Sequence, residues 1–271
     1  MENLNPTSKP KKKLKYFLFF LVALTVAIFI SHFVWKSSGS NQWEEAYEGD
    51  GIKVWTKKIP GNPFLLAKGT TRIKSNLAGI MKFMRDPASC DDVGCYASRI
   101  LDVKESNYPS LVYYTFRYDL FFPFKPREFV CKSVFEQDPK TKAMFVTFEI
   151  DATKMPPDPE DCCVRPTYMY NTWRFTPVEN GEVEVEFNYD AGDMGGALPY
   201  ALTNVGVVPL YKDTFNLLKI NVAKEKYQIA KVDYVREVGE DVPAPAAESV
   251  PAEATATPAD TPADTSVDTT H

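Results

Sequence analysis

Residues 182–219, EVEVEFNYDAGDMGGALPYALTNVGVVPLYKDTFNLLK, join an alternating strand to a long apolar helix through a glycine-rich turn. Valines and aromatic residues alternate with polar residues over the first nine positions, which predicts a strand with one buried face. After Pro199, apolar residues recur at near-helical intervals, and a proline suits the first turn of a helix. Pro209 should kink this helix, because proline removes a backbone donor and crowds the carbonyl one turn back.

The preceding 150 or so residues contain mainly strand patterns. Residues 43–47 suggest a short helix, residues 52–59 and 64–74 suggest strands, and a second helix should end before Pro87. Six further strand patterns follow: SRILDVKE, LVYYTFRYD, REFVCKSVFE, KAMFVTFEID, RPTYMYNTWRF and EVEVEFNYD. This order predicts an α+β fold in which a curved antiparallel sheet wraps around the long C-terminal helix.

The N-terminus has the composition of a membrane anchor. Lysines dominate the basic leader, residues 1–15, and residues 16–35 form an uncharged apolar run long enough to cross a bilayer. The lysine excess before the span predicts a cytoplasmic N-terminus and a domain on the far side. A bacterial inner membrane facing the periplasm fits, and a eukaryotic luminal protein is the alternative. Bulky residues after the span favour an uncleaved signal anchor over cleavage near Ser38 or Ser40.

Beyond the span, a linker at 36–42 leads to the folded segment, residues 43–236. Residues 237–271 are acidic and rich in Pro, Ala and Thr, so we expect this tail to be disordered. The basic leader and the acidic tail leave the folded segment nearly neutral, which argues against nucleic-acid binding. We expect that segment to behave as a monomeric soluble domain.

The folded segment lacks histidine. The chain has two histidines, His32 within the span and His271 at the end. Nucleophile pairs that need histidine and histidine-bound zinc are therefore excluded from the folded segment. We predict no catalytic residue, cofactor or metal. Asp158, Glu160 and Asp161 cluster in one loop, where a solvated turn is the plain interpretation and calcium binding the alternative.

The five cysteines are too few for a disulfide scaffold. In an oxidising space, Cys90 and Cys95, which enclose a short loop, are the candidate disulfide. The alternative is that all five are small buried hydrophobic residues or free thiols. Adjacent Cys162 and Cys163 lack the spaced partners of a zinc site.

Three short motifs resemble the START family, the StAR-related lipid transfer domains with a helix-grip fold. PREFV, residues 126–130, is similar to the family's Arg-Asp-Phe-Val strand opening. MPPDPEDCCVRP, residues 155–166, resembles a Met-Pro loop that returns to a Val-Arg strand, and DMGGALP, residues 193–199, resembles the elbow before the terminal helix. The positions assigned a structural role by this resemblance are Arg127, Arg165, Asp193, Gly196 and Pro199. Arg165 is expected to pair with an acid such as Asp193.

The resemblance implies a nine-stranded sheet around the helix, a tunnel for one lipid, and a mobile loop at the tunnel mouth, here Asp119–Pro126. Phe121, Phe122 and Phe124 lie in this loop between charged residues. Together with Pro209 they are the predicted gate or membrane contact. The alternative is that these aromatic side chains pack into the core.

In cholesterol-binding members of the family, an acid and an arginine orient the sterol hydroxyl. Those positions fall here at Tyr114 and Ser133, so recognition by a charged pair is not expected, and the alternative is that this tyrosine and serine bind a hydroxyl or an ester. Sterol, hopanoid, phospholipid and fatty acid all remain open as ligands. Glu149 shares a strand face with Phe145 and Thr147, and the pattern does not decide whether that face meets cavity or solvent. The predicted lipid contacts are Tyr114, Phe116, Ser133, Phe145, Thr147, Glu149, Trp173, Leu202, Val205 and Val208.

The sequence therefore predicts a membrane-tethered lipid-binding or lipid-transfer protein that is not an enzyme. Two alternatives remain. One is a helix-grip enzyme such as a cyclase or hydrolase, against which the missing histidines count. The other is a lipid-sensing module whose tail or membrane span recruits a partner.

Overall fold

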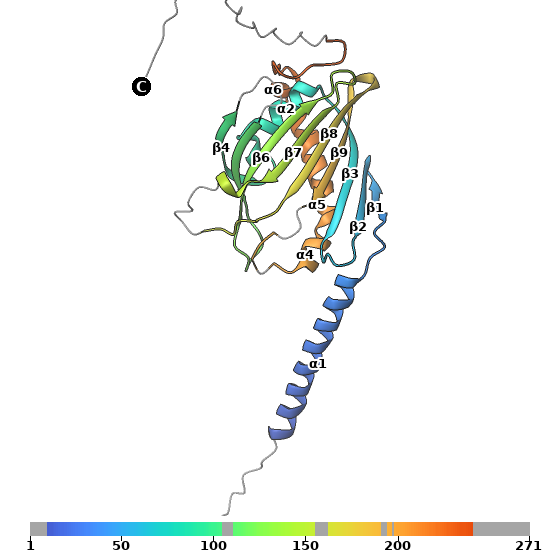
Figure 1. Cartoon of the computed structure of the whole chain (residues 1–271), viewed down its shortest axis with the longest axis vertical. Helices are drawn as coiled ribbons and strands as arrows, with labels where there is room; N and C mark the ends of the chain where they lie inside the picture. The colour runs from blue at the N-terminus through green and yellow to red at the C-terminus, as the bar shows by residue number, and fades with distance from the viewer. Residues whose placement is uncertain (1–9, 105–110, 155–161, 191–193, 197, 241–271) are drawn as a thin grey trace, which may run out of the picture. The chain divides into compact units, whose positions relative to one another are not determined.

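The computed structural model describes residues 10–104, 111–154, 162–190, 194–196 and 198–240 (Figure 1). Within them, nine strands form one antiparallel sheet in the order β1-β2-β3-β9-β8-β7-β6-β5-β4. The strands are β1 (Trp43–Gly49), β2 (Ile52–Lys58), β3 (Leu65–Lys74), β4 (Cys95–Lys104), β5 (Leu111–Tyr118), β6 (Arg127–Gln137), β7 (Met144–Ile150), β8 (Tyr170–Val178) and β9 (Glu182–Asp190). The helices are α1 (Pro10–Ser37), α2 (Leu77–Arg85), α3 (Ser89–Asp92), α4 (Tyr200–Val205), α5 (Val207–Val222) and α6 (Glu225–Gln228).

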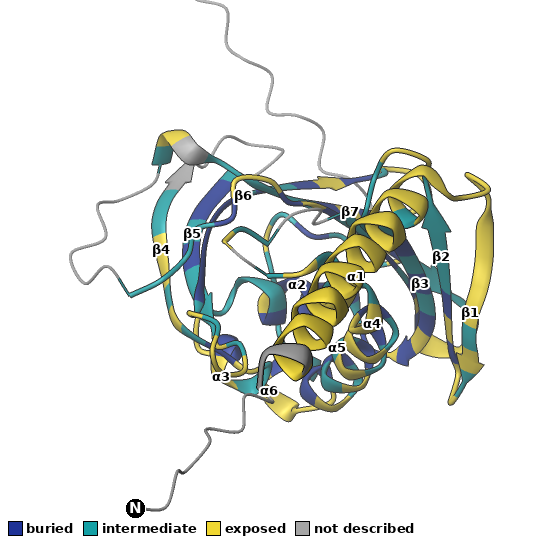
Figure 2. Cartoon of the chain, turned by 90° about the horizontal axis from the view of Figure 1, so that it is seen from below, coloured by how far each residue is buried: buried dark blue, intermediate teal, exposed yellow. Residues whose placement is uncertain are grey.

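The sheet curves around α5 (Figure 2). On β9, Val183, Val185 and Phe187 are buried, because a strand sends alternate side chains to opposite faces. On α5, Tyr211 and Phe215 are fully buried against this layer. The predicted α+β helix-grip fold is confirmed.

Residues 43–47 form part of a strand, so the helix suggested for them is wrong. β1 pairs antiparallel with β2 along its whole length, with a bulge between Glu45 and Tyr47. The Lys57 and Lys68 ammonium groups lie 5.0 and 4.9 Å from the centre of the Trp43 ring. Pairing with the open edge of β2 outweighs the helix preference of the Glu-Glu-Ala run, as tertiary context often does.

The C-terminal helix is interrupted at Gly206, between α4 and α5. Pro209 lies in the first turn of α5 and has no backbone N–H for the carbonyl of Val205, the last residue of α4. The hydrogen bond from Leu210 N to Gly206 O, 3.0 Å, opens the new helix. The predicted interruption is present, and it falls one turn before the proline.

Arg127 connects the start of β6 to the elbow before α4. It is 1% exposed, and its guanidinium donates to the backbone carbonyls of Met194 at 2.7 Å, Gly195 at 2.9 Å and Lys125. Gly195 and Gly196 have positive φ angles of 78° and 67°, a region that disfavours other residues. The buried guanidinium thus holds the turn from which the last helices start.

Arg165 pairs with Glu128, and the expected partner Asp193 lies outside the described residues. Arg165 Nη2 lies 2.6 Å from Glu128 Oε2, and Arg117 Nη2 lies 2.9 Å from Oε1 of the same carboxylate. Glu128 is 2% exposed, so two cations satisfy one buried anion. The predicted leader through residue 9, the tail from residue 241 and the acids Asp158, Glu160 and Asp161 also lie outside the described residues.

Two disulfides join neighbouring cysteines. One links Cys90 to Cys95, between α3 and the first residue of β4. The other links the adjacent residues Cys162 and Cys163, a bond that the sequence did not suggest. Cys131 is a buried free thiol, and burial raises its pKa.

α1 contains the apolar segment, and its last turn contacts the folded segment. The stretch Lys13–Ser37 is long and apolar enough to cross a membrane, and a signal sequence would pass the same test. Trp35 Nε1 donates to the Pro63 carbonyl at 2.8 Å, and the Trp35 ring stacks on Tyr200 at the start of α4. Asn204 Nδ2, also from α4, donates to the same carbonyl at 3.0 Å. The end of α1 and helix α4 therefore meet at Pro63.

Candidate functional site

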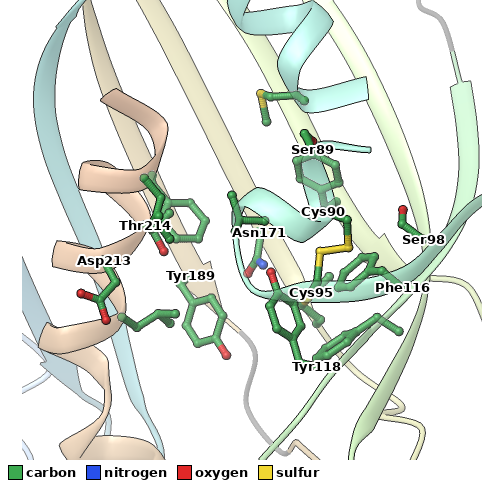
Figure 3. A pocket seen from close by; sticks show the side chains of 18 of the residues that line it. Ser89, Cys90, Cys95, Ser98, Phe116, Tyr118, Asn171, Tyr189, Asp213 and Thr214 are labelled. Atoms are coloured by element: carbon green, nitrogen blue, oxygen red, sulfur yellow. A yellow bond between two sulfur atoms is a disulfide. The ribbon is translucent and has the colours of Figure 1, made fainter. Parts of the chain in front are cut away.

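An apolar cavity of about 690 Å³ lies between the inner face of the sheet and the helices (Figure 3). Its sheet wall comes from β4 to β9, and its helical wall comes from α2, α3, α4 and α5. In Figure 3, Asp213 and Thr214 of α5 stand on one side, across from the Cys90–Cys95 disulfide and Phe116. The volume falls in the range of small-molecule sites, which is about 300–1,000 Å³.

One row of side chains crosses five strands of the sheet wall. The register pairs Val112 with Ser133, Ser133 with Phe148, Phe148 with Asn171, and Asn171 with Tyr189. All five residues line the cavity. Because directly paired residues point to the same side of a sheet, this row forms a continuous strip of wall.

Aromatic rings cover much of the sheet wall. The Phe116 ring stacks on Phe129 with centroids 5.1 Å apart and on Tyr114 at 5.6 Å. Trp173 and Phe187 stack at 4.1 Å. Such rings supply a large apolar surface with few rotatable bonds, which suits the enclosure of an apolar molecule.

The polar groups deep in the cavity are neutral. Burial raises the pKa values of the Tyr114, Tyr118 and Tyr189 phenols, so they stay protonated at neutral pH. The Tyr189 hydroxyl lies 3.6 Å from Met194 Sδ. Asn171 is 9% exposed, and its Oδ1 has no hydrogen-bond partner among the described residues.

Charged residues of the lining are already engaged or are exposed. Arg85 Nη1 donates to the Tyr234 hydroxyl at 2.7 Å, and Asp86 Oδ2 accepts from the Tyr227 hydroxyl at 3.1 Å. Asp213 is exposed on α5. The lining is thus mainly apolar, and its described charged residues are hydrogen-bonded or exposed.

The loop between β5 and β6 borders the cavity. Asp119 and Phe121 are among the lining residues, and Asp119 Oδ1 accepts from the Tyr96 hydroxyl at 2.8 Å. Phe121 packs edge to face on Phe124 with centroids 5.3 Å apart. Phe122 is 94% exposed, so its side chain presents an apolar ring at the surface of a loop that borders the cavity.

Half of the predicted lipid contacts line the cavity, namely Tyr114, Phe116, Ser133, Trp173 and Leu202. Phe145, Thr147 and Glu149 do not, because they lie on the outer face of β7. Phe145 is exposed beneath the Arg174 guanidinium, and Glu149 pairs with Lys132. Their inward neighbour is Phe148, so the face left open by the sequence is the solvent face.

The predicted contacts on the last helices are shifted by one or two positions. Val205 is 78% exposed, and Val208 packs against the main core. Besides Leu202, the residues of this segment that line the cavity recur at helical intervals: Thr203, Gly206, Val207, Leu210, Asp213, Thr214, Leu217 and Leu218. Pro209 is exposed and outside the lining.

The sequence reasoning also missed Asn171 and Tyr189. Tyr189 was assigned to the inner face of β9 but not to the site. Asn171 alternates with Trp173 and Phe175 along β8, and that alternation was the available signal. A polar residue at an inward position of a strand is the feature that could have identified it.

No protein-family model matches the chain. An uncharacterized protein of Pseudomonas aeruginosa is 24% identical over 181 residues, which cover 66% of this chain and 86% of that protein. The structure of a STAR-related lipid transfer protein from Xanthomonas axonopodis superposes with a TM-score of 0.60 at 23% identity, over 67% of this chain and 99% of that one.

Human structures extend the likeness at lower identity. Human StAR-related lipid transfer protein 5 superposes with a TM-score of 0.55 at 14% identity, over 74% of this chain and 95% of that one. The lipid transfer domain of human StarD13 gives 0.57 at 12% identity, over 68% and 90%. These likenesses show the fold, which is that of the START domains.

Proposed function

We propose that this chain is a membrane-anchored lipid-binding and lipid-transfer protein, and not an enzyme, that encloses one hydrophobic ligand between the sheet and the C-terminal helices. The observation that supports this proposal most directly is the apolar cavity of about 690 Å³. Burial of apolar surface gains about 25 cal/mol per Å², so such a cavity can hold a lipid by enclosure alone.

The lining supports binding rather than turnover. The folded segment, residues 43–236, contains no histidine. Among the described residues, no group of three His, Cys, Asp or Glu side chains could hold a metal ion. The START domains that superpose on the chain carry lipid transfer in their names.

The apolar helix supports the anchoring part of the proposal. The leader's lysines precede the span, which favours a cytoplasmic N-terminus and a folded segment on the far side, in the bacterial periplasm. The Cys90–Cys95 and Cys162–Cys163 disulfides are consistent with an oxidising compartment. The folded segment would act there as a monomer.

The contacts of α1 support a cavity mouth that works next to its own membrane. Tyr200 stacks on Trp35 of α1, and two residues further on Leu202 lines the cavity. With the anchor held against α4, the loop carrying Phe122 would act as a lid. Lipid would enter and leave when this loop and α4 move apart.

A transfer assay tests the proposal. Full-length protein in donor vesicles would be mixed with acceptor vesicles, and the arrival of a labelled lipid would be followed by fluorescence. We expect Phe122→Asp to slow transfer several-fold, since the lid then loses its apolar contact with the bilayer. Phe145→Asp, an exposed ring on the outer face of the sheet, is the matched control and should leave transfer unchanged. Wild-type transfer no faster than without protein would refute the proposed function.

A further inference from the structure

The side-chain oxygen of Asn171, Oδ1, is buried and has no hydrogen-bond partner among the described residues. Among the described side chains, three buried oxygens have no hydrogen-bond partner: those of Thr115, Asn171 and Thr203. Thr115 is not part of the cavity lining, whereas Thr203 lines the cavity from α4, on the helical wall. Asn171 alone of the three faces the cavity from the sheet wall (Figure 3). A buried polar group without a partner is costly, so it points to a partner that arrives with the ligand.

The position of Asn171 fits a recognition role. Its cross-strand neighbours Phe148 and Tyr189 both line the cavity, so the amide is set in an aromatic wall. Ser133 lies on the same row on the other side of Phe148, two strands away and hence about 10 Å distant. A ligand that lies along this row would meet polar groups at separated points and apolar surface elsewhere.

The chemistry of an amide selects the partner. Oδ1 accepts a hydrogen bond and Nδ2 donates, and a hydroxyl both donates and accepts. A hydroxyl therefore pairs with the Asn171 side chain in either of its two flipped orientations. An ether or ester oxygen only accepts, so it would leave Oδ1 without a partner.

Anionic ligands are disfavoured by the charges around the cavity. The described lining contains one cation, Arg85, whose guanidinium donates to Tyr234 and lies over its ring at 4.8 Å. The remaining charged lining residues, Asp86, Asp119 and Asp213, are acids. A buried carboxylate or phosphate would meet neutral phenols and an amide at Asn171, and an unpaired buried charge is strongly unfavourable.

We propose that Asn171 is the specificity-determining contact of the site and that it hydrogen-bonds the hydroxyl of an uncharged lipid alcohol. This deepens the proposed function and rests on it. Lipid acids and phospholipids are the classes that this contact rejects. Tyr114 and Ser133 contribute wall but not the selecting hydrogen bond.

The test uses three probes with one hydrocarbon chain: oleyl alcohol, its methyl ether and oleate at pH 8. Purified full-length protein in detergent is incubated with an equimolar mixture, and the bound ligands are counted by native mass spectrometry. The readout is the ratio of bound alcohol to bound ether. Partitioning into micelles affects this ratio equally in every variant, so it cancels in the comparison.

In the wild type we expect the alcohol to exceed both competitors. Asn171→Leu should lower the alcohol-to-ether ratio by roughly three- to tenfold, the value of one neutral hydrogen bond, while binding of the ether is kept. Retained ether binding also shows that the variant is folded. Ser89→Ala is the matched control, because this lining hydroxyl is already bonded to the Phe83 carbonyl at 2.9 Å. It should leave the ratio unchanged.

Three outcomes would overturn the inference. Oleate as the preferred ligand of the wild type would show that the site selects anions. An unchanged ratio in Asn171→Leu would show that the amide does not select the hydroxyl, and an equal fall in Ser89→Ala would show a general effect of the wall. In all three cases lipid is bound, so the proposed function stands. If the wild type binds none of the probes, the proposed function fails as well.

Discussion

The two long faces of α5 meet the same sheet in different ways. On one face, Tyr211 and Phe215 are fully buried, and the Tyr211 hydroxyl donates to the Ala67 carbonyl of β3 at 2.8 Å. On the other face, Leu210, Thr214 and Leu217 line the cavity. One helix therefore closes half of the sheet as solid core and leaves the other half hollow.

Side-chain size explains the filled half. Gly69 of β3 lies against the rings of Tyr211 and Phe215, where a Cβ atom would overlap the Tyr211 ring. The missing side chain lets α5 approach β3 closely. Across the cavity from α5, α3 and β4 are joined by the Cys90–Cys95 disulfide and form the opposite wall. Stability should reside mainly in the filled half, and binding in the hollow half.

The largest expected effect comes from truncating the filled face. Phe215→Ala should lower the free energy of unfolding by about 3–5 kcal/mol, because it removes a fully buried ring and leaves a cavity. Leu217→Ala, two residues away on the hollow face, should cost less than about 2 kcal/mol, since this side chain is only partly surrounded by protein. Denaturant unfolding of the full-length protein, followed by tryptophan fluorescence, measures both. Equal losses would erase the proposed difference between the faces.

The sequence predicted the filled half well and the hollow half poorly, for physical reasons. Buried Val183, Val185 and Phe187 alternate with acids, so their inward direction could be read from β9 alone. β7 has phenylalanines on both faces, Phe145 and Phe148, so an aromatic residue alone does not mark its inner face. Buried Met144 and Val146 alternate with Phe145 and show that Phe148 is the inward one.

The position of the cavity along α4 and α5 was even harder to predict from the sequence. Val205 and Val208 were predicted as lipid contacts because they are apolar, whereas the residues that line the cavity include Gly206, Leu210 and Thr214. A cavity is defined by how far apart two elements are held, and local periodicity reports only that a residue is apolar. The motifs around Arg127 and Gly196 identified the fold because they mark a fixed backbone turn.

The next effect concerns the disulfide that borders the hollow half. Replacing both Cys90 and Cys95 with serine should lower the free energy of unfolding by about 2 kcal/mol, the value for a short closed loop in the chain-entropy model. The measurement is the denaturation midpoint of the full-length protein under oxidising conditions. Treating the double variant with a reductant is the control, since the Cys90–Cys95 contribution should then be absent already. No difference between wild type and variant would show that this wall is held by packing alone.

Filling the hollow should separate binding from stability. Ser133→Phe places a ring in the row that crosses the sheet wall, so lipid binding should fall at least about tenfold, a loss of about 1.4 kcal/mol. The melting temperature should stay the same or rise, because a hollow is being filled. Competition binding and thermal unfolding provide the two readouts. A large fall in melting temperature would mean that the wall at Ser133 is already packed.

The smallest effect is a pH dependence at the edge of the hollow. Burial raises the pKa of Asp86, whereas hydrogen bonds from Ala88 N and the Tyr227 hydroxyl and the ion pair with Lys226 lower it. The lowering contributions together are larger than the effect of burial, so the pKa of Asp86 in the folded state lies below its ordinary value. Ionised Asp86 therefore stabilises the folded state above its unfolded pKa, near 4, and this contribution is lost as the pH falls through the lower folded value.

Asp86→Asn should weaken the dependence of the free energy of unfolding on pH below about pH 4. The change should be less than about 1 kcal/mol, because solvent reaches the Lys226 partner. The exposed neighbour Asp91→Asn is the control. Unfolding curves between pH 3 and 6 would show the effect. If the free energy of unfolding of Asp86→Asn depends on pH as it does in the wild type, the contacts of Asp86 do not contribute to the pH dependence.

The most direct test of the central claim is to count the lipid that the hollow carries. Full-length protein would be purified in mild detergent and released intact in a native mass spectrometer. We expect one lipid per wild-type chain and a strongly reduced bound fraction for Ser133→Phe. Wild-type protein that carries no lipid and takes up none from added vesicles would contradict the claim that the space beside α5 is a lipid site.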